Sequence, residues 1–482
     1  MKFKIIKKYK DMNIIIKATF WFMFATIIQK AINFITMPIF TRIMEPSEYG
    51  LYTMYISWLN IFSIFTSLKL DGSVFNKSMS KFKNDRDGFI ASIQIETLFL
   101  TLFCAIIYLI FHNFFNSLTE MPTTLMLLMF LQLLFQPAYT FWILKQRYEY
   151  KYISFILITI ISAILSTTIG IIYVLSVTNN KGYARILPFA IIQIILGIVF
   201  FIINNIKGYK KIKFDYIKYV TIFNLPLIPH YISHYILDQL DRIMIQKMVN
   251  LTKTAIYNSA YTIAMILKIV TDSFIAAITP WYYDRLEKKE YDKIKKIFIP
   301  IFSITMLFIT LFILVTPELF KIILPEKYYE SIYVIPPVSI SIVFLMMYSF
   351  FSLPEFFFES TKFSMYMSLI GAVMNFILNY IFIKRYGYLA AGYTTMICYL
   401  FFALSHYWYS NKILNKNIKE VLFSQHKVYL ICFISILVAT ISPFLYKYII
   451  FRLIIILIIA TILFANKKKI VNYYKIIKNK ND

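Results

Sequence analysis

The chain has 482 residues, of which 59% are hydrophobic and 19% aromatic, and its formal net charge is +26 at pH 7. Soluble domains are nearer about 45–50% apolar, so this composition excludes an ordinary water-soluble globular protein and places most of the surface against lipid. In that setting the positive charge indicates basic loops that face anionic headgroups rather than a nucleic-acid partner.

Fourteen apolar segments follow one another along the chain, each long enough to cross about 30 Å of hydrocarbon as a helix. They lie at about residues 12–41, 50–68, 88–111, 122–144, 153–178, 184–204, 217–248, 252–279, 297–315, 334–358, 363–383, 387–409, 428–446 and 448–465. Membrane strands are excluded because they alternate polar and apolar residues over about ten positions, whereas these segments are apolar on all sides. The sequence therefore predicts an all-α integral membrane protein of about 14 transmembrane helices.

Lysine and arginine collect in every second connection between these segments. Thirty-five of the 50 fall in the termini and in the connections on the same side, and ten fall in the other connections. Cytoplasmic loops of membrane proteins carry this excess, so both termini are predicted to be cytoplasmic. The remaining five lie inside predicted spans: Lys17, Lys30, Arg242, Lys268 and Arg452.

A weak repeat at an offset of 205 residues relates Met12–Asn204 to Ile217–Tyr409. Six spans separate the copies, so both halves have the same orientation, as in transporters with a central site between two lobes. The predicted organisation is a basic cytoplasmic N-terminus (1–11), an N-terminal lobe of six spans (12–204), a cytoplasmic linker (205–216), a C-terminal lobe of six spans (217–409), a linker with two further spans (410–465) and a basic cytoplasmic tail (466–482).

Charges inside the predicted spans are the first candidates for function, because a charge at a membrane-helix centre costs roughly 2.5–3.5 kcal/mol. Lys17 and Arg452 lie near helix ends and are predicted to extend to the interface. Lys30 lies too far inside its segment for its side chain to reach the interface. This position favours a side chain that faces a water-filled cavity over one in an internal ion pair. Lys268 has Asp272 one turn further on, so it is either a structural partner of Asp272 or a cavity cation.

Further charges mark the third, seventh and tenth segments. Asp238, Asp241 and Arg242 share one polar face of the seventh segment, either as an ion-pair lock between lobes or as substrate contacts. Glu355 lies at the inner end of the tenth segment and is predicted to be interfacial. Glu96, in the third segment, is either a proton-coupling carboxylate or a hydrogen-bonded structural one.

Prolines interrupt the first segment of each half, Pro38 in one and Pro226 with Pro229 in the other. Proline removes a backbone hydrogen bond and bends a helix, which suits a hinge, although packing against a neighbour is the alternative. No cofactor is predicted, because the sequence has no phosphate-binding loop, nucleophile elbow or paired-cysteine site. His230 and His234 offer only two ligands on one helix face, so no metal site is predicted either.

Four motifs, in order along the chain, resemble those of polysaccharide-unit flippases. They are Asn224–His230 (NLPLIPH) followed by Leu240–Ile245 (LDRIMI), Ala255–Tyr261 (AIYNSAY), Thr41-Arg42 with Glu48–Tyr52 (EYGLY), and Lys327–Tyr329 with Ile335-Pro336. The resemblance extends over nearly the whole chain to about residue 409. The sequence is thereby similar to the O-antigen and capsule branch of the multidrug/oligosaccharidyl-lipid/polysaccharide exporter superfamily.

This resemblance implies a MATE-like fold of two six-helix lobes plus a C-terminal helix pair. The implied function is a bacterial inner-membrane flippase that moves an undecaprenyl-diphosphate-linked oligosaccharide repeat unit outward by alternating access. Related flippases accommodate the anionic headgroup in a cationic central cavity lined by helices one, two, seven and eight. On those helices the candidates are Lys30, Lys69, Arg242 and Lys268. An arginine that relatives often carry on the second helix is replaced here by Lys77 in the sequence Asn76-Lys77.

The gating or ion-pair candidates are Arg42, Asp238, Asp241 and Asp272. The expected partners are the lipid-linked glycan, membrane lipids, a coupling ion (H⁺ or Na⁺) and the polysaccharide polymerase machinery, with no nucleic acid. A multidrug or cation antiporter of the same superfamily is an alternative, favoured by the two aspartates of the seventh segment. A lipid II flippase is another. An enzyme such as a polymerase is not expected, because no connection is long enough for a catalytic outer loop.

Overall fold

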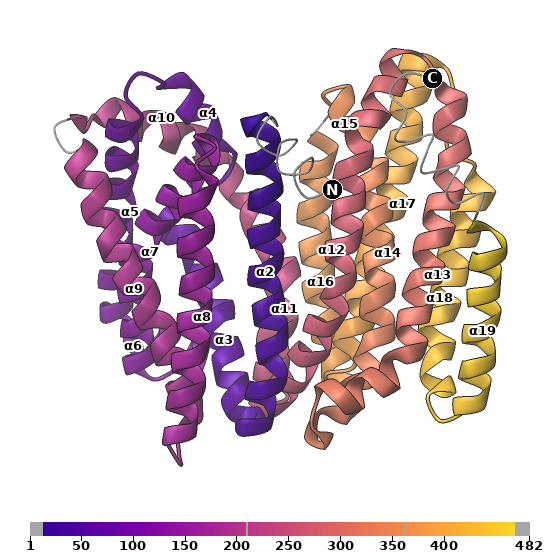
Figure 1. Ribbon diagram of the computed structural model, residues 1–482, viewed down its shortest axis with the longest axis horizontal. Helices are drawn as coiled ribbons and strands as arrows, with labels where there is room; N and C mark the ends of the chain where they lie inside the picture. Colours follow the sequence, from indigo (N-terminus) through magenta and orange to yellow (C-terminus); the bar gives the residue numbers. More distant parts are fainter. Residues whose placement is uncertain (1–12, 209–210, 361, 468–482) are drawn as a thin grey trace, which may run out of the picture. The chain divides into compact units, whose positions relative to one another are not determined.

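The computed structural model describes residues 13–208, 211–360 and 362–467 (Figure 1). In the first half of the chain the helices are α2 (Ile14–Ile43), α3 (Pro46–Ser67), α4 (Ser73–Lys81), α5 (Arg86–Ile110), α6 (His112–Thr119), α7 (Thr123–Tyr148), α8 (Tyr152–Ser176), α9 (Lys181–Gly208) and α10 (Phe214–Asn224), followed by the 3₁₀ turn η2 (Leu225–Leu227). In the second half they are α11 (Ile228–Met248), α12 (Leu251–Glu287), α13 (Tyr291–Ile323), η3 (Glu326–Val334), α14 (Ile335–Phe351), α15 (Leu353–Phe357), α16 (Lys362–Tyr386), α17 (Ala390–Ile418), α18 (Gln425–Leu445) and α19 (Ile449–Ala465).

The all-helical prediction is confirmed, since these described residues form no strand. Ten of the described helical stretches are long and apolar enough to cross a membrane. Helices also occupy the other four predicted spans, namely α3, α10 with α11, α17 and α19, but they lie outside that length and composition criterion. The structure therefore supports a multi-pass membrane protein, and it does not establish fourteen crossings.

Helix α8 shows how these sequences are adapted to lipid. Its buried residues include the small and polar Thr159, Ser162, Ser166, Thr167 and Gly170. Its exposed residues are large and apolar: Ile153, Leu157, Ile161, Ile164, Leu165, Ile169 and Ile172. Small residues let membrane helices approach closely, while leucine and isoleucine are at no disadvantage against acyl chains. This inside-out pattern is the physical reason that α8 packs on α2 and α9 with an apolar outer face.

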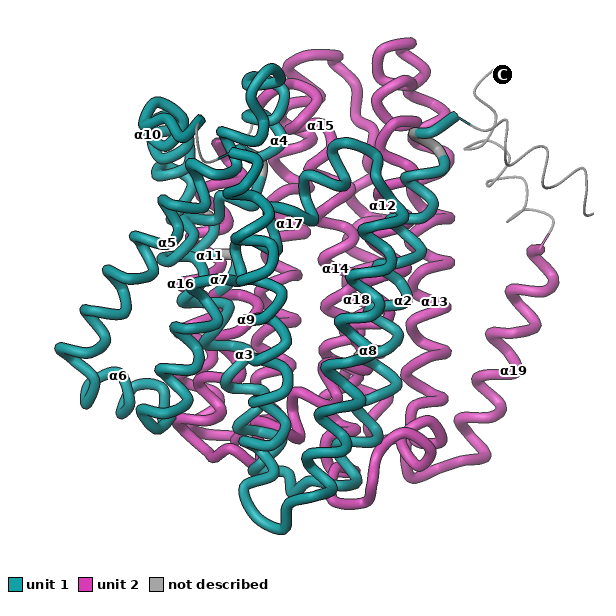
Figure 2. The backbone as a smooth tube through the Cα atoms, turned by 60° about the vertical axis from the view of Figure 1, so that its left-hand side comes forward, with its two compact units in different colours: residues 1–235 teal, residues 236–482 magenta. Residues whose placement is uncertain are grey.

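The chain divides into two compact units, Met1–Tyr235 (unit 1) and Ile236–Asp482 (unit 2) (Figure 2). The boundary between the units falls within α11. In unit 1, α9 packs against α3, α5, α7 and α8. In unit 2, α14 is the central helix: fourteen of its seventeen residues are buried, and α12, α13, α17 and α18 pack around it. The C-terminal helices α18 and α19 belong to unit 2 and pack on α13.

The predicted helix breaks take different forms in the structure. Helix α2 continues through Pro38 to Ile43 without an interruption. The seventh segment is interrupted: α10 ends at Asn224, Pro226 lies in η2, and Pro229 is the second residue of α11. Proline is tolerated in a first helical turn because its missing N–H would have no helical partner there. At this break the side chain of Asn224 donates to the carbonyl of Leu68, at the end of α3.

The prediction that Arg452 extends to the membrane interface is wrong. Arg452 is buried in unit 2, and its two terminal nitrogens donate to the two carboxylate oxygens of Glu318 at 2.7 Å each. One of these nitrogens also donates to the carbonyl of Leu314 at 2.7 Å. A bidentate arginine–carboxylate pair is among the strong hydrogen-bonded contacts in proteins. This pair fastens α19 to α13.

Removing the two members of this pair is expected to have unequal effects. The Glu318 side chain is 47% exposed and that of Arg452 only 5%, so Glu318→Ala leaves a buried cation without its carboxylate. We expect this variant to lose about 3 kcal/mol of unfolding free energy, at the low end of the range for breaking a buried pair. Arg452→Ala leaves a half-exposed carboxylate and should cost less. Thermal unfolding of the purified proteins measures both, and an equal or reversed order would contradict the asymmetry.

Candidate functional site

The most highly connected buried carboxylate in unit 2 is Asp241 of α11, which is 2% exposed. One carboxylate oxygen accepts a hydrogen bond from the amide of Asn379 at 2.6 Å. The other accepts from the hydroxyl of Tyr257 at 2.8 Å and from that of Thr395 at 2.6 Å. These donors come from α16, α12 and α17, so one carboxylate joins three other helices of unit 2 to α11.

The network around Asp241 extends along α16 and α17. The side-chain amide nitrogen of Asn379 also donates to the side-chain oxygen of Asn375 at 3.1 Å, and the side-chain oxygen of Asn379 accepts from the hydroxyl of Thr394. Asn375 is fully buried, and its own amide nitrogen has no hydrogen-bond partner among the described residues. Asparagines one turn apart in an apolar segment were the available signal for this cluster, and sequence reasoning missed it. The result is a compact group of carboxylate, amide and hydroxyl oxygens inside a membrane-spanning unit.

Arg242, the next residue of α11, has a separate set of partners. Its Nε donates to the side-chain oxygen of Asn258 at 2.7 Å, and a terminal nitrogen donates to the backbone carbonyl of Asp238. The guanidinium lies 4.4 Å from the ring centroid of Tyr261. An amide, a carbonyl and an aromatic ring are thus among the groups that hold Arg242.

Lys268 and Asp272 of α12 form the ion pair that their spacing allows, with 2.6 Å between Nζ and the nearer carboxylate oxygen. Their side chains are 33% and 53% exposed, so the pair is open to its surroundings. Exposed pairs of this kind contribute roughly 0–1 kcal/mol, which leaves the charge of Lys268 available to a stronger anion.

The candidates of unit 1 lie on α2 and in the turn after α3. Lys30 is exposed on α2, and no described carboxylate lies within 4.0 Å of it. Arg42, in the last turn of α2, donates to the carbonyl of Pro38 at 3.1 Å. Lys69 lies outside the helices, between α3 and α4, with its Nζ 3.4 Å from Asp71 and 5.1 Å from the ring centroid of Tyr235. The four substrate-contact candidates therefore divide equally between the two units.

Glu355, predicted to be interfacial, is buried among other side chains and not exposed. Its side chain is fully buried in unit 2, and one carboxylate oxygen lies 2.6 Å from Nδ1 of His406. The other accepts from the hydroxyl of Ser364 at 2.9 Å. The rings of Tyr348 and Phe363 pack against the imidazole at centroid distances of 4.6 and 5.3 Å. This pair ties the short helix α15 to α17 and α16.

A double-mutant cycle on Glu355 and His406 is expected to reveal strong coupling. Glu355→Ala leaves the imidazole of His406 buried without its carboxylate partner, and His406→Ala leaves the carboxylate of Glu355 buried with only its hydrogen bond from Ser364. An orphaned buried polar group costs about 1–3 kcal/mol. The double variant removes both groups, so its loss of stability should be less than the sum of the single losses by about 1–3 kcal/mol. Thermal unfolding of the four purified proteins measures this difference. Additive losses would show that the contact contributes no coupling.

Two further charges of unit 1 are buried. Glu96 accepts from the hydroxyl of Thr221 at 2.5 Å, which matches the hydrogen-bonded alternative for this residue. Arg185 is in the second turn of α9 and is 5% exposed. Its guanidinium lies 4.1 and 4.6 Å from the ring centroids of Phe40 and Tyr52. The side chains of His230 and His234, and the predicted termini 1–11 and 468–482, lie outside the described residues.

Long apolar helices in two units, with buried polar networks and no extended loop domain among the described residues, define a multi-pass membrane protein. Residues 15–285 match the model of the family described as "Polysaccharide biosynthesis protein". This match covers more than half of the chain, and the protein belongs to that family. The family resemblance stated from the motifs is thereby confirmed.

A curated relative and several solved structures are also similar. "Lsg locus putative protein 1" of Haemophilus influenzae is 24% identical over 282 residues, which is 54% of this chain and 64% of that protein's length. The structure titled "Lipid II flippase MurJ, inward closed conformation" superposes with a TM-score of 0.64 at 15% identity, covering 92% of this chain and 98% of that one. A multidrug resistance MATE family transporter in an inward-facing conformation has a TM-score of 0.58 at 13% identity, covering 81% and 96%. These likenesses establish a shared fold.

Proposed function

We propose that this protein is a flippase for undecaprenyl-diphosphate-linked oligosaccharide repeat units in surface polysaccharide biosynthesis, of the O-antigen or capsule type. It would carry the unit from the cytoplasmic to the outer leaflet of a bacterial inner membrane by alternating access. The observation that carries the proposal is the set of cations that remain inside the spans of a polysaccharide biosynthesis family member: Lys30, Arg242 and Lys268.

The physical argument starts from the diphosphate. Two or three lysine or arginine groups in a low-dielectric cavity attract a diphosphate strongly, and the ion pair of Lys268 with Asp272 is exposed enough to leave Lys268 available to a stronger anion. Lys69 adds a fourth cation next to Asp71. We propose that these residues line a cationic cavity that receives the headgroup. An antiporter for organic cations would need the reverse polarity, with Asp238 and Asp241 as its binding groups.

The energetics favour outward movement. Moving one elementary charge across 100 mV is worth about 2.3 kcal/mol, so a dianion that moves outward with an inside-negative potential gains about 4–5 kcal/mol. Return of the empty cationic cavity then needs a coupling ion, H⁺ or Na⁺. The oxygen-rich cluster around Asp241 offers the ligands that such an ion prefers, and we propose it as the place to look for coupling.

The orientation is part of the proposal. The excess of lysine and arginine on one side of the predicted spans supports cytoplasmic termini. Reporter fusions after about residues 208 and 467 should be active only with a reporter that works in the cytoplasm. A periplasm-specific reporter that is active at either position would reverse the orientation and, with it, the direction of transport.

The decisive experiment follows the lipid-linked unit in a strain that lacks this gene. The undecaprenyl-diphosphate-linked glycan should accumulate in the cytoplasmic leaflet, surface polysaccharide should be lost, and the intact gene should restore both. Normal leaflet distribution in that strain would contradict the proposal. Accumulation of lipid II instead would favour a lipid II flippase, and unchanged glycan with increased drug sensitivity would favour a multidrug antiporter. A polymerase that works beside this protein is the partner to seek in pull-downs.

A further inference from the structure

A pocket of about 690 Å³ opens at the end of unit 1 where α5 begins and α7 ends. It is lined by Arg86, Arg147, Tyr148, Glu149, Tyr150 and Lys151. This volume is within the range of about 300–1,000 Å³ that is usual for small-molecule sites. The lining carries three basic side chains and one acidic one, and it does not include Lys30, Arg42 or Lys69, the functional candidates of the same unit.

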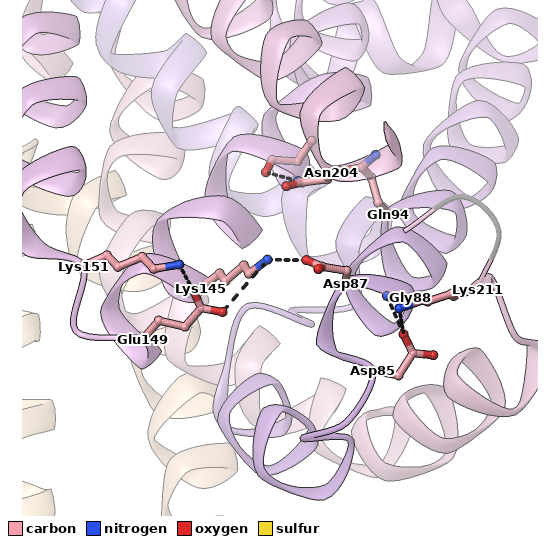
Figure 3. Close-up of polar contacts among 10 residues, drawn as sticks. Asp85, Asp87, Gly88, Gln94, Lys145, Glu149, Lys151, Asn204 and Lys211 are labelled. Carbon is pink, nitrogen blue, oxygen red and sulfur yellow. Dashed lines mark hydrogen bonds and ion pairs between the residues drawn. The ribbon is translucent and has the colours of Figure 1, made fainter. Parts of the chain in front are cut away.

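The acidic residue of the pocket is already engaged by lysines. Glu149 accepts from Nζ of Lys151 at 2.6 Å, and its other oxygen lies 4.0 Å from Nζ of Lys145 (Figure 3). Lys145 also pairs with Asp87 at the start of α5. These residues form a chain of alternating charges that is close to neutral. The positive charge of the pocket therefore comes from its two arginines.

Arg86 is oriented without a carboxylate. Its Nε donates to the carbonyl of Met79 at 3.1 Å, and its guanidinium lies 4.8 Å from the ring centroid of Tyr148. No described carboxylate oxygen lies within 4.0 Å of its nitrogens, and its terminal N–H groups make no hydrogen bond to described residues. The ring and the carbonyl hold the planar group while leaving its outer edge for a ligand.

Arg147 is held in a similar way from the other side of the pocket. Its guanidinium lies 4.8 Å from the ring centroid of Phe155, and one terminal nitrogen is 3.4 Å from the hydroxyl of Thr26. It too has no ion-pair partner among the described residues. Two unpaired guanidinium groups in one pocket repel each other, and an anion between them would remove that repulsion.

We propose that this pocket binds a phosphate group, supplied by the headgroup of an anionic phospholipid. Guanidinium forks match phosphate oxygens in pairs, which favours phosphate over a simple halide. The pocket lies at the ends of membrane-spanning helices, where headgroups are found, and basic pockets between such helices bind anionic lipid headgroups. The site requires no glycan and is independent of the proposed translocation.

The test titrates the full-length purified protein with phosphatidylglycerol or phosphatidylcholine of equal chain length and counts bound lipids by native mass spectrometry. The wild type should retain phosphatidylglycerol in preference to phosphatidylcholine. Hydrogen bonds to charged groups contribute about 1.5–3 kcal/mol, so each arginine lost should weaken the tightest phosphatidylglycerol site at least about tenfold. Arg86→Gln with Arg147→Gln should therefore weaken it by about a hundredfold or more. The lysine variants Arg86→Lys and Arg147→Lys, which keep the charge without the fork, should fall between.

The matched control is Lys211→Gln with Lys213→Gln. It removes the same charge from unit 1, but these lysines do not line the pocket; they lie 3.8 and 3.5 Å from carboxylate oxygens of Asp85. The control should bind phosphatidylglycerol as the wild type does. Equal losses in both double variants, or no loss in the arginine variant, would overturn the proposal. If the arginine double variant does not fold, as judged by thermal unfolding, the same binding measurement is made on the two single variants Arg86→Gln and Arg147→Gln.

A second experiment tests whether the bound phosphate group belongs to a lipid or to a free anion. Inorganic phosphate alone should bind the detergent-purified wild type much more weakly than phosphatidylglycerol does, because it gains nothing from acyl chains beside the apolar helices. Inorganic phosphate that binds as tightly as the lipid, and loses that binding in the arginine variant, would overturn the lipid as the source.

Discussion

Replacing Lys30 and Lys268 together with alanine is expected to abolish glycan export in cells. Each lysine is a cation in a predicted span, and a diphosphate that enters a low-dielectric cavity without them loses several kcal/mol of stabilisation. Surface polysaccharide, measured in a deletion strain that carries the variant gene, should fall to the level of the empty vector. Full export by this double variant would rule out the proposed roles of both residues.

The control for this experiment removes two lysines from the same helices. Lys17 is in the first turn of α2, and Lys253 is in the first turn of α12, where it pairs with Glu330 at 2.5 Å. The variant Lys17→Ala with Lys253→Ala has the same net charge as the test variant and should export normally. Immunoblots of both variants in membranes separate a transport defect from a loss of protein. Equal loss in both would indicate a general dependence on charge.

A second comparison tests what Lys268 does. In the structure it is paired with Asp272, so Lys268→Ala leaves a negative charge where the proposal requires a positive one. If the pair is only structural, Lys268→Ala with Asp272→Ala should restore export, since the unbalanced aspartate is gone. If Lys268 contacts the diphosphate, the double variant should remain defective. Export by this variant at the wild-type level would remove Lys268 from the cavity.

Replacing Asp241 with alanine is expected to have the largest effect on stability. Its carboxylate is the acceptor for Tyr257, Asn379 and Thr395, and the substitution orphans all three buried donors. An orphaned donor costs about 1–3 kcal/mol, so the total loss of unfolding free energy should be about 3 kcal/mol or more. Export should fall with it. Thermal unfolding in detergent, with and without stabilising lipid, measures the loss.

Two control variants for Asp241→Ala are an aspartate-to-alanine substitution at an exposed position and a milder substitution at Asp241 itself. Asp272→Ala removes a half-exposed aspartate from the neighbouring helix α12 and should change stability by less than about 0.5 kcal/mol. Asp241→Asn keeps the size and one acceptor oxygen, so its loss should lie between those of the two alanine variants. An Asp241→Ala protein as stable as the wild type would show that the three donors find other acceptors.

The helical membrane fold could be predicted because its signal is local. A segment of about twenty apolar residues has one way to satisfy its backbone in lipid, and that way needs no information from the rest of the chain. The same holds for the break before α11, where Pro226 and Pro229 exclude a continuous helix by their own chemistry. Pro38 shows the limit of this reasoning, because α2 accommodates it without an interruption.

The positions of buried charges could not be predicted in the same way. Arg452 and Glu355 were both assigned to the interface from their places near segment ends, and both are buried against partners far along the chain, Glu318 and His406. A charge remains in lipid-like surroundings only when a partner offsets its desolvation, and the partner is known only once helices are packed. The i,i+4 pair of Lys268 with Asp272 was foreseeable because both members lie on one helix.

The same division applies to the candidate site. Residue types and spacing were enough to single out Lys30, Arg242, Lys268 and Asp241, because a charge is conspicuous in an apolar segment wherever it points. The packing of the helices decided which partners contact each of these charges. Four helices of unit 2 contribute to the Asp241 cluster, and a ring, an amide and a carbonyl contact Arg242. Lipid exposure is a property of single segments, whereas hydrogen bonds between distant residues exist only after the helices have come together.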